Sequence, residues 1–270
     1  MYFIKAILDI VIILLLLRLL IRPNESYYNQ ILSLLYRITD PLLIPSRSFT
    51  RNDTKGIFLS ILCLVVLRGL AYISIKPMSF ISGEGYSFLN LFQLLLQFYM
   101  VIWFVSVLSQ YGSGTFFTNI VQRAFLPLSM ISSRLGIPRR HFSIFTFLFL
   151  LVVYALLSYL IHYVMITRAV SASFSIVHGF GEGLILIIGL FPGFFSLVII
   201  VGALLSWVSP DPYNPVVQAI YGISEPLLAP FRRFVPNLGG LDISPIIALL
   251  CFQMLGRLGQ QLVASLIGIF

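Results

Sequence analysis

The chain has 270 residues, of which 59% are hydrophobic and 10% charged, and its formal net charge is +8. Soluble domains carry about a quarter charged residues, so this composition excludes an ordinary soluble domain and is typical of a membrane protein. The basic residues lie in short loops between apolar runs, so membrane topology explains the positive charge better than nucleic-acid binding does. Cys63 and Cys251 lie inside apolar runs and form no metal or redox motif.

Six apolar segments approach the length of about 20 residues that a membrane-spanning helix needs. They cover residues 4–21, 56–75, 88–108, 143–165, 183–208 and 244–270. The first segment begins like a signal peptide, but Asp9 and Arg18 interrupt it and no cleavage site follows, so we expect a retained span. Arg18 lies near the end of that span, and its side chain is expected to extend to the membrane surface. In the fifth segment, GLFPGF at 189–194 predicts a kink or a close helix contact.

The loops between these segments differ in charge. Lys5, Lys76 and Arg168 are the basic residues on one side, and the three basic loops lie on the other. Cytoplasmic loops are enriched in Lys and Arg, so the basic loops are predicted to be cytoplasmic and both termini to lie outside. The residues of the basic loops are Arg22, Arg37, Arg47, Arg51, Lys55, Arg123, Arg134, Arg139, Arg140, Arg232 and Arg233.

The basic loops also resemble one another. Asn29, Tyr36, Asp40, Pro41, Pro45 and Arg47 recur 185 positions later as Asn214, Tyr221, Glu225, Pro226, Pro230 and Arg232. A weaker middle copy has Pro127 and the basic end, but Leu126 replaces the acid. Apolar residues with helical spacing coincide under the same offsets. The sequence therefore predicts an all-α membrane protein whose six spans form three parallel hairpin repeats, at 1–80, 81–170 and 171–270, each with a short amphipathic interfacial helix.

The repeated loop motif predicts a locked geometry at the interface. The proline after Asp40 or Glu225 is expected to end the short helix, because a residue before proline disfavours helical conformation. Glu225 is expected to pair with Arg232 or Arg233, and Asp40 with Arg47. The arginines are expected to bind anionic headgroups or a protein partner. The motif residues are Asn29, Asp40, Pro41, Pro45, Arg47, Asn214, Pro215, Glu225, Pro226, Pro230, Arg232, Arg233 and Asp242.

Ionisable residues inside spans are costly and are therefore functional candidates. Asp9 and Arg68 lie at similar depth in the first two spans, and their charges favour an ion pair. Arg257 lies near the middle of the last span, and Gly256 and Gly259 offer a small-residue face that leaves room for self-association. A polar cluster around Arg257 indicates either interhelical hydrogen bonds or a polar path; its other members are Gln253, Gln260 and Gln261.

No residue pattern predicts a catalytic site, a metal site or a cofactor site. The few carboxylates are scattered among loops, and no Ser/His/Asp arrangement or metal-ligand spacing is found. His141, His162 and His178 lie at unmatched depths, which argues against a haem held between helices. An enzyme is the least expected class of protein.

The run NPVVQAIYGISEPLLAPFRRFVPNLGGLDISPIIALL, which begins at Asn214, resembles the YggT family of bacterial membrane proteins, which also has plastid relatives. NP, EPLLxPxRR, GGLD and SP carry the resemblance. The resemblance is strongest at 209–255, weaker at 11–73, where the motif reads DPLLIPSR, and degenerate at 97–160. Members of the family usually have two hairpins, so a third hairpin is a departure from the family pattern. The resemblance implies a multipass inner-membrane protein without established enzymatic chemistry. It also implies roles connected with osmotic stress and cation balance, with cell division or envelope organisation, or, in plastids, with thylakoid or cytochrome assembly.

Two functions are therefore expected for a protein of the bacterial inner membrane. The first is a scaffold or assembly factor whose loop surface engages lipid headgroups or another protein, with a homo-oligomer left open. The alternative is a channel or transporter in osmotic and cation (K+/Na+) homeostasis, with Arg257, Asp9 and Arg68 near its pathway. Dedicated cation sites usually need an acid near mid-membrane, and no predicted span has one there, so the scaffold is preferred.

Overall fold

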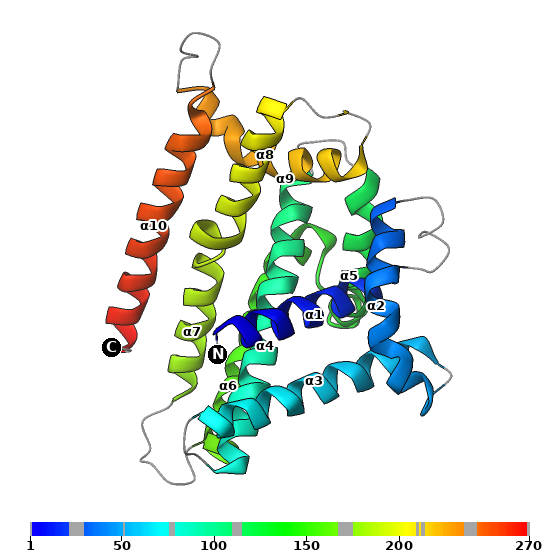
Figure 1. The fold of residues 1–270 in the computed structure, drawn as a ribbon. Helices are drawn as coiled ribbons and strands as arrows, with labels where there is room; N and C mark the ends of the chain where they lie inside the picture. Colours follow the sequence, from blue (N-terminus) through cyan, green and yellow to red (C-terminus); the bar gives the residue numbers. More distant parts are fainter. Residues whose placement is uncertain are drawn as a thin grey trace. The chain divides into compact units, whose positions relative to one another are not determined.

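The computed structural model describes residues 2–21, 30–50, 52–75, 79–109, 115–166, 175–208, 211, 214–234 and 242–268. All regular structure in these ranges is helical (Figure 1). The helices are α1 (Tyr2–Leu20), α2 (Gln30–Arg47), α3 (Asp53–Ile75), α4 (Phe80–Ser109), α5 (Thr115–Arg134), η2 (Arg139–His141), α6 (Phe142–Ile161), η3 (His162–Ile166), α7 (Ile176–Ile188), η4 (Phe191–Phe195), α8 (Ser196–Val208), α9 (Pro215–Arg232) and α10 (Ser244–Ile267). The chain folds into two compact units, Met1–Phe98 with Tyr154–Gly179 and Tyr99–Val153 with Phe180–Phe270.

Within the described ranges, five helical segments are long and apolar enough to cross a membrane. They are Asp53–Ser74, Phe80–Leu108, Arg139–Ile166, Ile176–Val208 and Ser244–Ile267. The expectation of a helical membrane protein is thereby confirmed. The first predicted span forms α1, which carries Lys5, Asp9 and Arg18 and is not among the five, so a sixth span stays a prediction.

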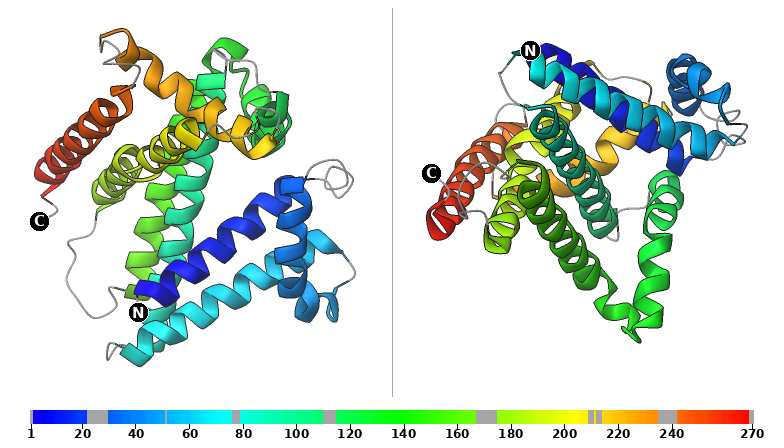
Figure 2. Two further views of the ribbon diagram at one scale, coloured as in Figure 1. Left: turned by 45° about the horizontal axis from the view of Figure 1, so that its top comes forward. Right: turned by 90° about the horizontal axis from the view of Figure 1, so that it is seen from below.

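In the first unit, α1 and α3 run side by side and α2 lies across one end of the pair (Figure 2). Their contact is apolar: Ile12 and Leu15 of α1, Val65 of α3 and Leu43 of α2 are almost fully buried. Close van der Waals packing of this kind is the main force that holds helices together in a membrane. The packing fixes α2 to the ends of its two neighbours.

In the second unit, α9 lies across α8 and α10 in the same manner. Glycines allow close approaches in this unit: a Cβ at Gly202 of α8 would collide with Ser224 of α9, and one at Gly256 of α10 would collide with Pro192 of η4. Gly259 likewise faces Ile188 of α7. The prediction that 256–259 leaves a face open for self-association is therefore wrong, because this face already packs inside the unit.

The three amphipathic helices continue through their prolines. Pro41 and Pro45 lie inside α2, Pro127 inside α5, and Pro226 and Pro230 inside α9. The prediction that proline ends the short helix is wrong. An internal proline removes a backbone hydrogen bond and costs about 3 kcal/mol, so tertiary contacts have to offset that cost. Buried leucines lie just after the first proline, at Leu43 of α2 and at Leu227 and Leu228 of α9.

The fifth predicted span is interrupted, as its GLFPGF run indicates. The α-helix α7 ends at Ile188 and the π-helical turn η4 separates it from α8. Carbonyl groups around the interruption accept hydrogen bonds from α10: Gln253 Nε2 donates to Pro192 O at 2.8 Å, and Gln260 Nε2 donates to Ile185 O at 3.1 Å. Such side-chain donors satisfy backbone groups at irregular points of a membrane helix.

Candidate functional site

Two clusters of polar and charged residues are centred on α2 and α9, the transverse helices that lie across the ends of their neighbours. The α2 cluster contains Arg18, Tyr36, Thr39, Asp40, Arg47 and Asp53, and the α9 cluster contains Glu225, Arg232 and Asp242. In both clusters an acid and an arginine seven residues apart lie on one face of the helix, two turns from each other. The ion pair therefore spans the two turns that contain the prolines. It compensates in part for the missing backbone hydrogen bonds.

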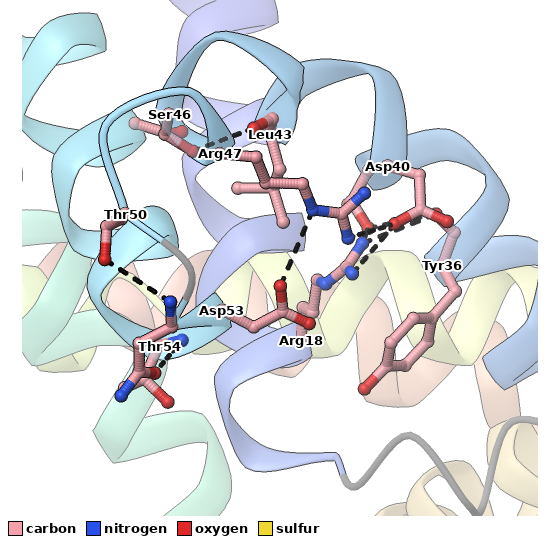
Figure 3. Close-up of polar contacts among 12 residues, drawn as sticks. Arg18, Tyr36, Asp40, Leu43, Ser46, Arg47, Thr50, Asp53 and Thr54 are labelled. Atoms are coloured by element: carbon pink, nitrogen blue, oxygen red, sulfur yellow. Dashed lines mark hydrogen bonds and ion pairs between the residues drawn. The ribbon is translucent and has the colours of Figure 1, made fainter.

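In the α2 cluster, Asp40 lies between two arginines (Figure 3). Arg18 Nη2 donates to Asp40 Oδ1 at 2.9 Å, and Arg47 Nη2 donates to the same oxygen at 3.0 Å. Arg47 Nε also lies 3.5 Å from Asp53 Oδ1 at the start of α3. The predicted pairing of Asp40 with Arg47 is present, and it forms part of a chain of charges from α1 through α2 to α3.

Arg18 does not extend to the membrane surface, and that prediction is wrong. Its side chain is 3% exposed, because α2 folds over the end of α1. Arg18 Nη1 donates to Thr39 Oγ1 at 2.7 Å, and the guanidinium carbon lies 4.3 Å from the centre of the Tyr36 ring. A cation at this distance from an aromatic face is favourably placed. Arg18 thus joins α1 to α2.

In the α9 cluster, Arg232 lies between two acids. Arg232 Nη1 and Nη2 both donate to the Glu225 carboxylate, the second at 3.2 Å, and Arg232 Nε donates to Asp242 Oδ2 at 2.8 Å. Asp242 Oδ1 accepts from the backbone N–H of Ser244 at 2.9 Å, so it also caps the start of α10. The predicted pairing of Glu225 with Arg232 is present. The resulting bridge joins α9 to α10.

The pKa values follow from this geometry. Burial by itself raises the pKa of Asp40, but the hydrogen bonds and charges of Arg18 and then Arg47 outweigh it, so the pKa lies below its usual value. Burial also raises the pKa of Asp242, and the hydrogen bonds from Ser244 and the hydrogen bond and charge of Arg232 again lower it below its usual value. The hydrogen bond to Glu225 raises the pKa of Arg232. All these groups are charged at neutral pH.

The other motif residues have simpler places. Asn214 caps α9, since its Oδ1 accepts from the N–H of Val216 at 2.9 Å. Arg233 is exposed at the end of α9. Pro215 begins α9, but its side chain lies outside the described residues, as does all of Asn29.

Asp9 and Arg68 form the ion pair that the sequence favours. Arg68 Nη1 donates to Asp9 Oδ1 at 2.6 Å. The rest of the guanidinium is bound by α4: Nε donates to Ser87 Oγ at 3.1 Å and Nη2 to Ser87 O at 2.6 Å. Nearby, Lys5 Nζ donates to Asn90 Oδ1 at 3.0 Å. These contacts join α1, α3 and α4 through polar groups inside the helix packing.

The polar residues of α10 do not form one cluster. Gln253 and Gln260, seven residues apart, face the interruption between α7 and α8, where they bind the two carbonyl groups described above. Arg257 and Gln261 lie on the exposed side of α10. Gln253 and Gln260 therefore make the interhelical hydrogen bonds that were one of the two expectations. The expected cluster around Arg257 is wrong.

Sequence reasoning missed three residues that matter for these sites. Arg18 was assigned no partner, and Ser87 and Glu84 lie just before the predicted third span, which began at 88. The structure begins α4 at Phe80, so both residues are helical and buried. A helical extension of the apolar stripe back to residue 80 is the signal that indicates their position. Among the described residues, no group of three or more His, Cys, Asp or Glu side chains is placed to hold a metal ion.

Comparison with known proteins gives partial matches. PA0392, an uncharacterised protein of Pseudomonas aeruginosa, is 44% identical over 85 residues, which cover 32% of this chain and 43% of that protein. The uncharacterised protein YggT of Escherichia coli K12 is 38% identical over 58 residues, which cover 22% of this chain and 30% of that protein. YlmG homolog protein 2, chloroplastic, of Arabidopsis thaliana is 37% identical over 70 residues, which cover 25% and 28% respectively. The matched part thus spans less than half of each of these relatives, and no solved structure matches the chain.

The CCB3/YggT family matches residues 181–263. This range contains η4, α8 and α9, together with most of α7 and α10, and it includes every residue of the α9 cluster. It also contains the NP, EPLLAPFRR, GGLD and SP elements that carry the resemblance in the sequence. Residues 181–263 of the chain therefore match the CCB3/YggT family, in agreement with the resemblance of the sequence.

Proposed function

We propose that the protein is a non-enzymatic scaffold or assembly factor of the bacterial inner membrane. Its six spans form three hairpins, and the basic helices α2, α5 and α9 lie at the cytoplasmic interface, with both termini outside. The surface of α9 near Arg232 engages a partner protein, and anionic headgroups support it there. Envelope organisation or stress tolerance is the process that such a scaffold serves.

The observation that carries this proposal is the double anchoring of Arg232. Two carboxylates hold its guanidinium, so the end of α9 is fixed relative to α10. Two residues after it, Phe234 is 85% exposed, and under the offset of 185 its counterpart after α2 is Phe49, which is 83% exposed. A rigid site that displays an exposed aromatic residue beside arginines is typical of a docking or membrane-interface surface.

The six-span topology is supported by the partners of the charges on α1. Asp9 pairs with Arg68, Lys5 donates to Asn90, and Arg18 is bound by residues of α2. Charges that are paired inside a helix bundle cost much less in a membrane than free ones. Helix α1 is therefore suited to a membrane in spite of its three charged residues. The crossing of α2 over α1 and α3, and of α9 over α8 and α10, supports hairpin repeats.

The transport alternative is less well supported by the geometry. Gln253 and Gln260 bind backbone carbonyl groups of the neighbouring helix, so they are not free to line a polar path. Arg257 lies on the exposed side of the same helix. These contacts favour a structural use of the polar residues of α10.

The test is site-specific photo-crosslinking in native membranes. Benzoylphenylalanine replaces Phe234 or, as the matched site, Phe49; a third variant carries it at Leu148, an exposed position of α6. A scaffold gives a protein adduct of one defined mass at position 234 that disappears in an Arg232→Gln background, whereas position 148 gives lipid adducts. Absence of protein adducts at both 49 and 234 contradicts the proposal.

Measurements of ion flux provide a second test, which addresses the transport alternative. The purified protein in liposomes is expected to pass no more K+ or Na+ than empty liposomes do under an osmotic gradient. Saturable, ion-selective flux that Arg257→Ala changes would replace the scaffold with the transport function. Circular dichroism of the reconstituted protein verifies that it is folded in both cases.

A further inference from the structure

Glu84 is a buried acid near the start of α4. Its side chain, five residues into α4, is 6% exposed, and neither carboxyl oxygen has a hydrogen-bond partner among the described residues. The other described acids in helix packing or clusters differ from it: Asp9, Asp40 and Asp242 are each bound by an arginine. An ionised carboxylate in such surroundings is strongly disfavoured, because burial removes its hydration and nothing replaces it.

The carboxyl group occupies a space that a glycine leaves open. A Cβ at Gly69 of α3 would collide with the Glu84 carboxyl, and Gly83 of α4 faces Ile73 and the Gly69 carbonyl. Glu84 is thus held where α3 and α4 approach most closely. One turn further along α4, Ser87 binds Arg68, the residue next to Gly69. The carboxyl therefore adjoins the Asp9–Arg68 ion pair without joining it.

We propose that Glu84 is a proton-binding site, a neutral carboxylic acid in the packed state of α3 and α4 that releases its proton only when this contact opens. A proton is the ligand that fits, since one carboxyl group is sufficient for it, whereas Ca²⁺ or Mg²⁺ takes six or more oxygen ligands. This inference concerns the first unit alone and holds whether or not α9 docks a partner.

The titratable groups that face this end of α4 come from two elements. Helix α1 contributes Lys5 and Asp9, and α3 contributes Arg68 and Tyr72. From η3 the backbone carbonyl of Met165 accepts a hydrogen bond from Ser82. Arg68 is the adjacent cation, and all three of its bonded nitrogens already have partners in Asp9 and Ser87. Ionised Glu84 would have to compete with Asp9 for Arg68, which couples release of the proton to the ion pair.

The experiment is infrared spectroscopy of the protein in lipid nanodiscs. The wild type is expected to show the C=O stretch of a protonated carboxyl at neutral pH, and Glu84→Gln is expected to remove it. The Gln side chain has the shape of the neutral acid, so this variant is expected to fold. The matched control is Glu225→Gln, which removes an exposed, ion-paired carboxylate and is expected to leave the band unchanged. A band that Glu84→Gln leaves unchanged overturns the proposal.

Dicyclohexylcarbodiimide provides an independent readout. This apolar reagent adds the O–H of a protonated carboxyl across a C=N bond, and the adduct rearranges to a stable N-acylurea that peptide mass spectrometry locates. Labelling at Glu84 is expected at neutral pH and falls roughly tenfold per pH unit above the midpoint of proton release. Absence of labelling at all pH values contradicts the proposal. Protection by Na+ or K+ at constant pH contradicts it too and identifies a cation site.

Discussion

The α2 and α9 clusters share one arrangement of charges and differ by one arginine. Both keep an acid and an arginine two helical turns apart, across two prolines, and the offset of 185 residues relates Asp40 to Glu225 and Arg47 to Arg232. In both, the arginine also pairs with an acid of the following segment, Asp53 in one case and Asp242 in the other. The α2 cluster alone has a further arginine, Arg18 of the preceding helix, which binds Asp40.

The difference shows which part of the motif is local. The pair within the helix is set by the sequence of the helix itself, while the other charges of each cluster depend on the neighbouring helices to which the transverse helix is bound. Arg18 fastens α2 to α1, and Asp242 fastens α9 to α10. At the position of α8 that corresponds to Arg18 the chain has Ala203. Ser224, the counterpart of Thr39, is accordingly buried without a hydrogen-bond partner among the described residues.

The largest expected effect is the loss of Arg18. Arg18→Met leaves Asp40 with Arg47 alone and leaves Thr39 without its charged donor. We expect the free energy of unfolding to fall by about 2–4 kcal/mol, since several hydrogen bonds to a buried charge are lost. An SDS titration in mixed micelles measures this. Arg233→Met, at the exposed end of α9, is the control and is expected to change the midpoint little. Equal effects of the two substitutions would contradict the anchoring role of Arg18.

The ion pairs within each helix could be predicted from the sequence, whereas the contacts between helices could not. An acid and an arginine seven positions apart lie on one helix face, so the Glu225–Arg232 and Asp40–Arg47 pairs could be read from spacing alone. Nothing local indicates that α2 folds over Arg18. The prolines were mispredicted for the same reason. The local preference that ends a helix before Pro41 or Pro226 is overridden by the tertiary packing of the residues before and after each proline.

Helical periodicity indicates some of these contacts but not all of them. Gln253 and Gln260 are seven residues apart and share one face of α10, but Arg257 is four residues from Gln253 and three from Gln260, so spacing alone does not separate it from them. The packing of α10 against α7 and η4 decides which of these side chains is covered. For Glu84, the apolar segment that begins at residue 88 leaves out the first two turns of a helix that begins at Phe80. A buried acid beside a glycine of another helix has no signal in the sequence of its own helix.

The next prediction compares the two buried hydroxyl groups. Thr39→Val preserves shape but removes the acceptor for Arg18, so we expect a loss of about 1–2 kcal/mol in unfolding free energy. Ser224→Ala removes a hydroxyl that makes no hydrogen bond among the described residues, so stability is expected to stay the same or to rise by up to about 1 kcal/mol. Both variants are measured by the same SDS titration. A loss of stability in Ser224→Ala as large as in Thr39→Val would show that the two sites are equivalent after all.

A smaller effect distinguishes the two arginines within the helices. Arg232→Gln leaves both Glu225 and Asp242 without their arginine, whereas Arg47→Gln removes the arginine of Asp53 but leaves Asp40 bound to Arg18. Arg232 is partly exposed, so we expect a loss of about 0.5–1 kcal/mol for Arg232→Gln and less for Arg47→Gln. Thermal unfolding in detergent at low and at high salt measures both, and the Arg232 effect is expected to shrink with salt. The reverse ranking would contradict the two-acid arrangement of the α9 cluster.

The smallest effect is a pH dependence at the acidic end. The arginines and other donors hold the pKa values of Asp40 and Asp242 below the usual value of about 3.9. For a lowered pKa in the folded state, the stabilisation is fully present above the usual value and is lost as pH falls through the lowered one. Stability is therefore expected to decline below about pH 4, and Asp40→Asn or Asp242→Asn should each flatten this decline.

In an Arg18→Met background the contribution of Asp40 should shrink while that of Asp242 stays, because each acid is held by a different arginine. If Arg18→Met altered both contributions equally, the two clusters would be coupled, and the view that each fastens its own transverse helix would be wrong.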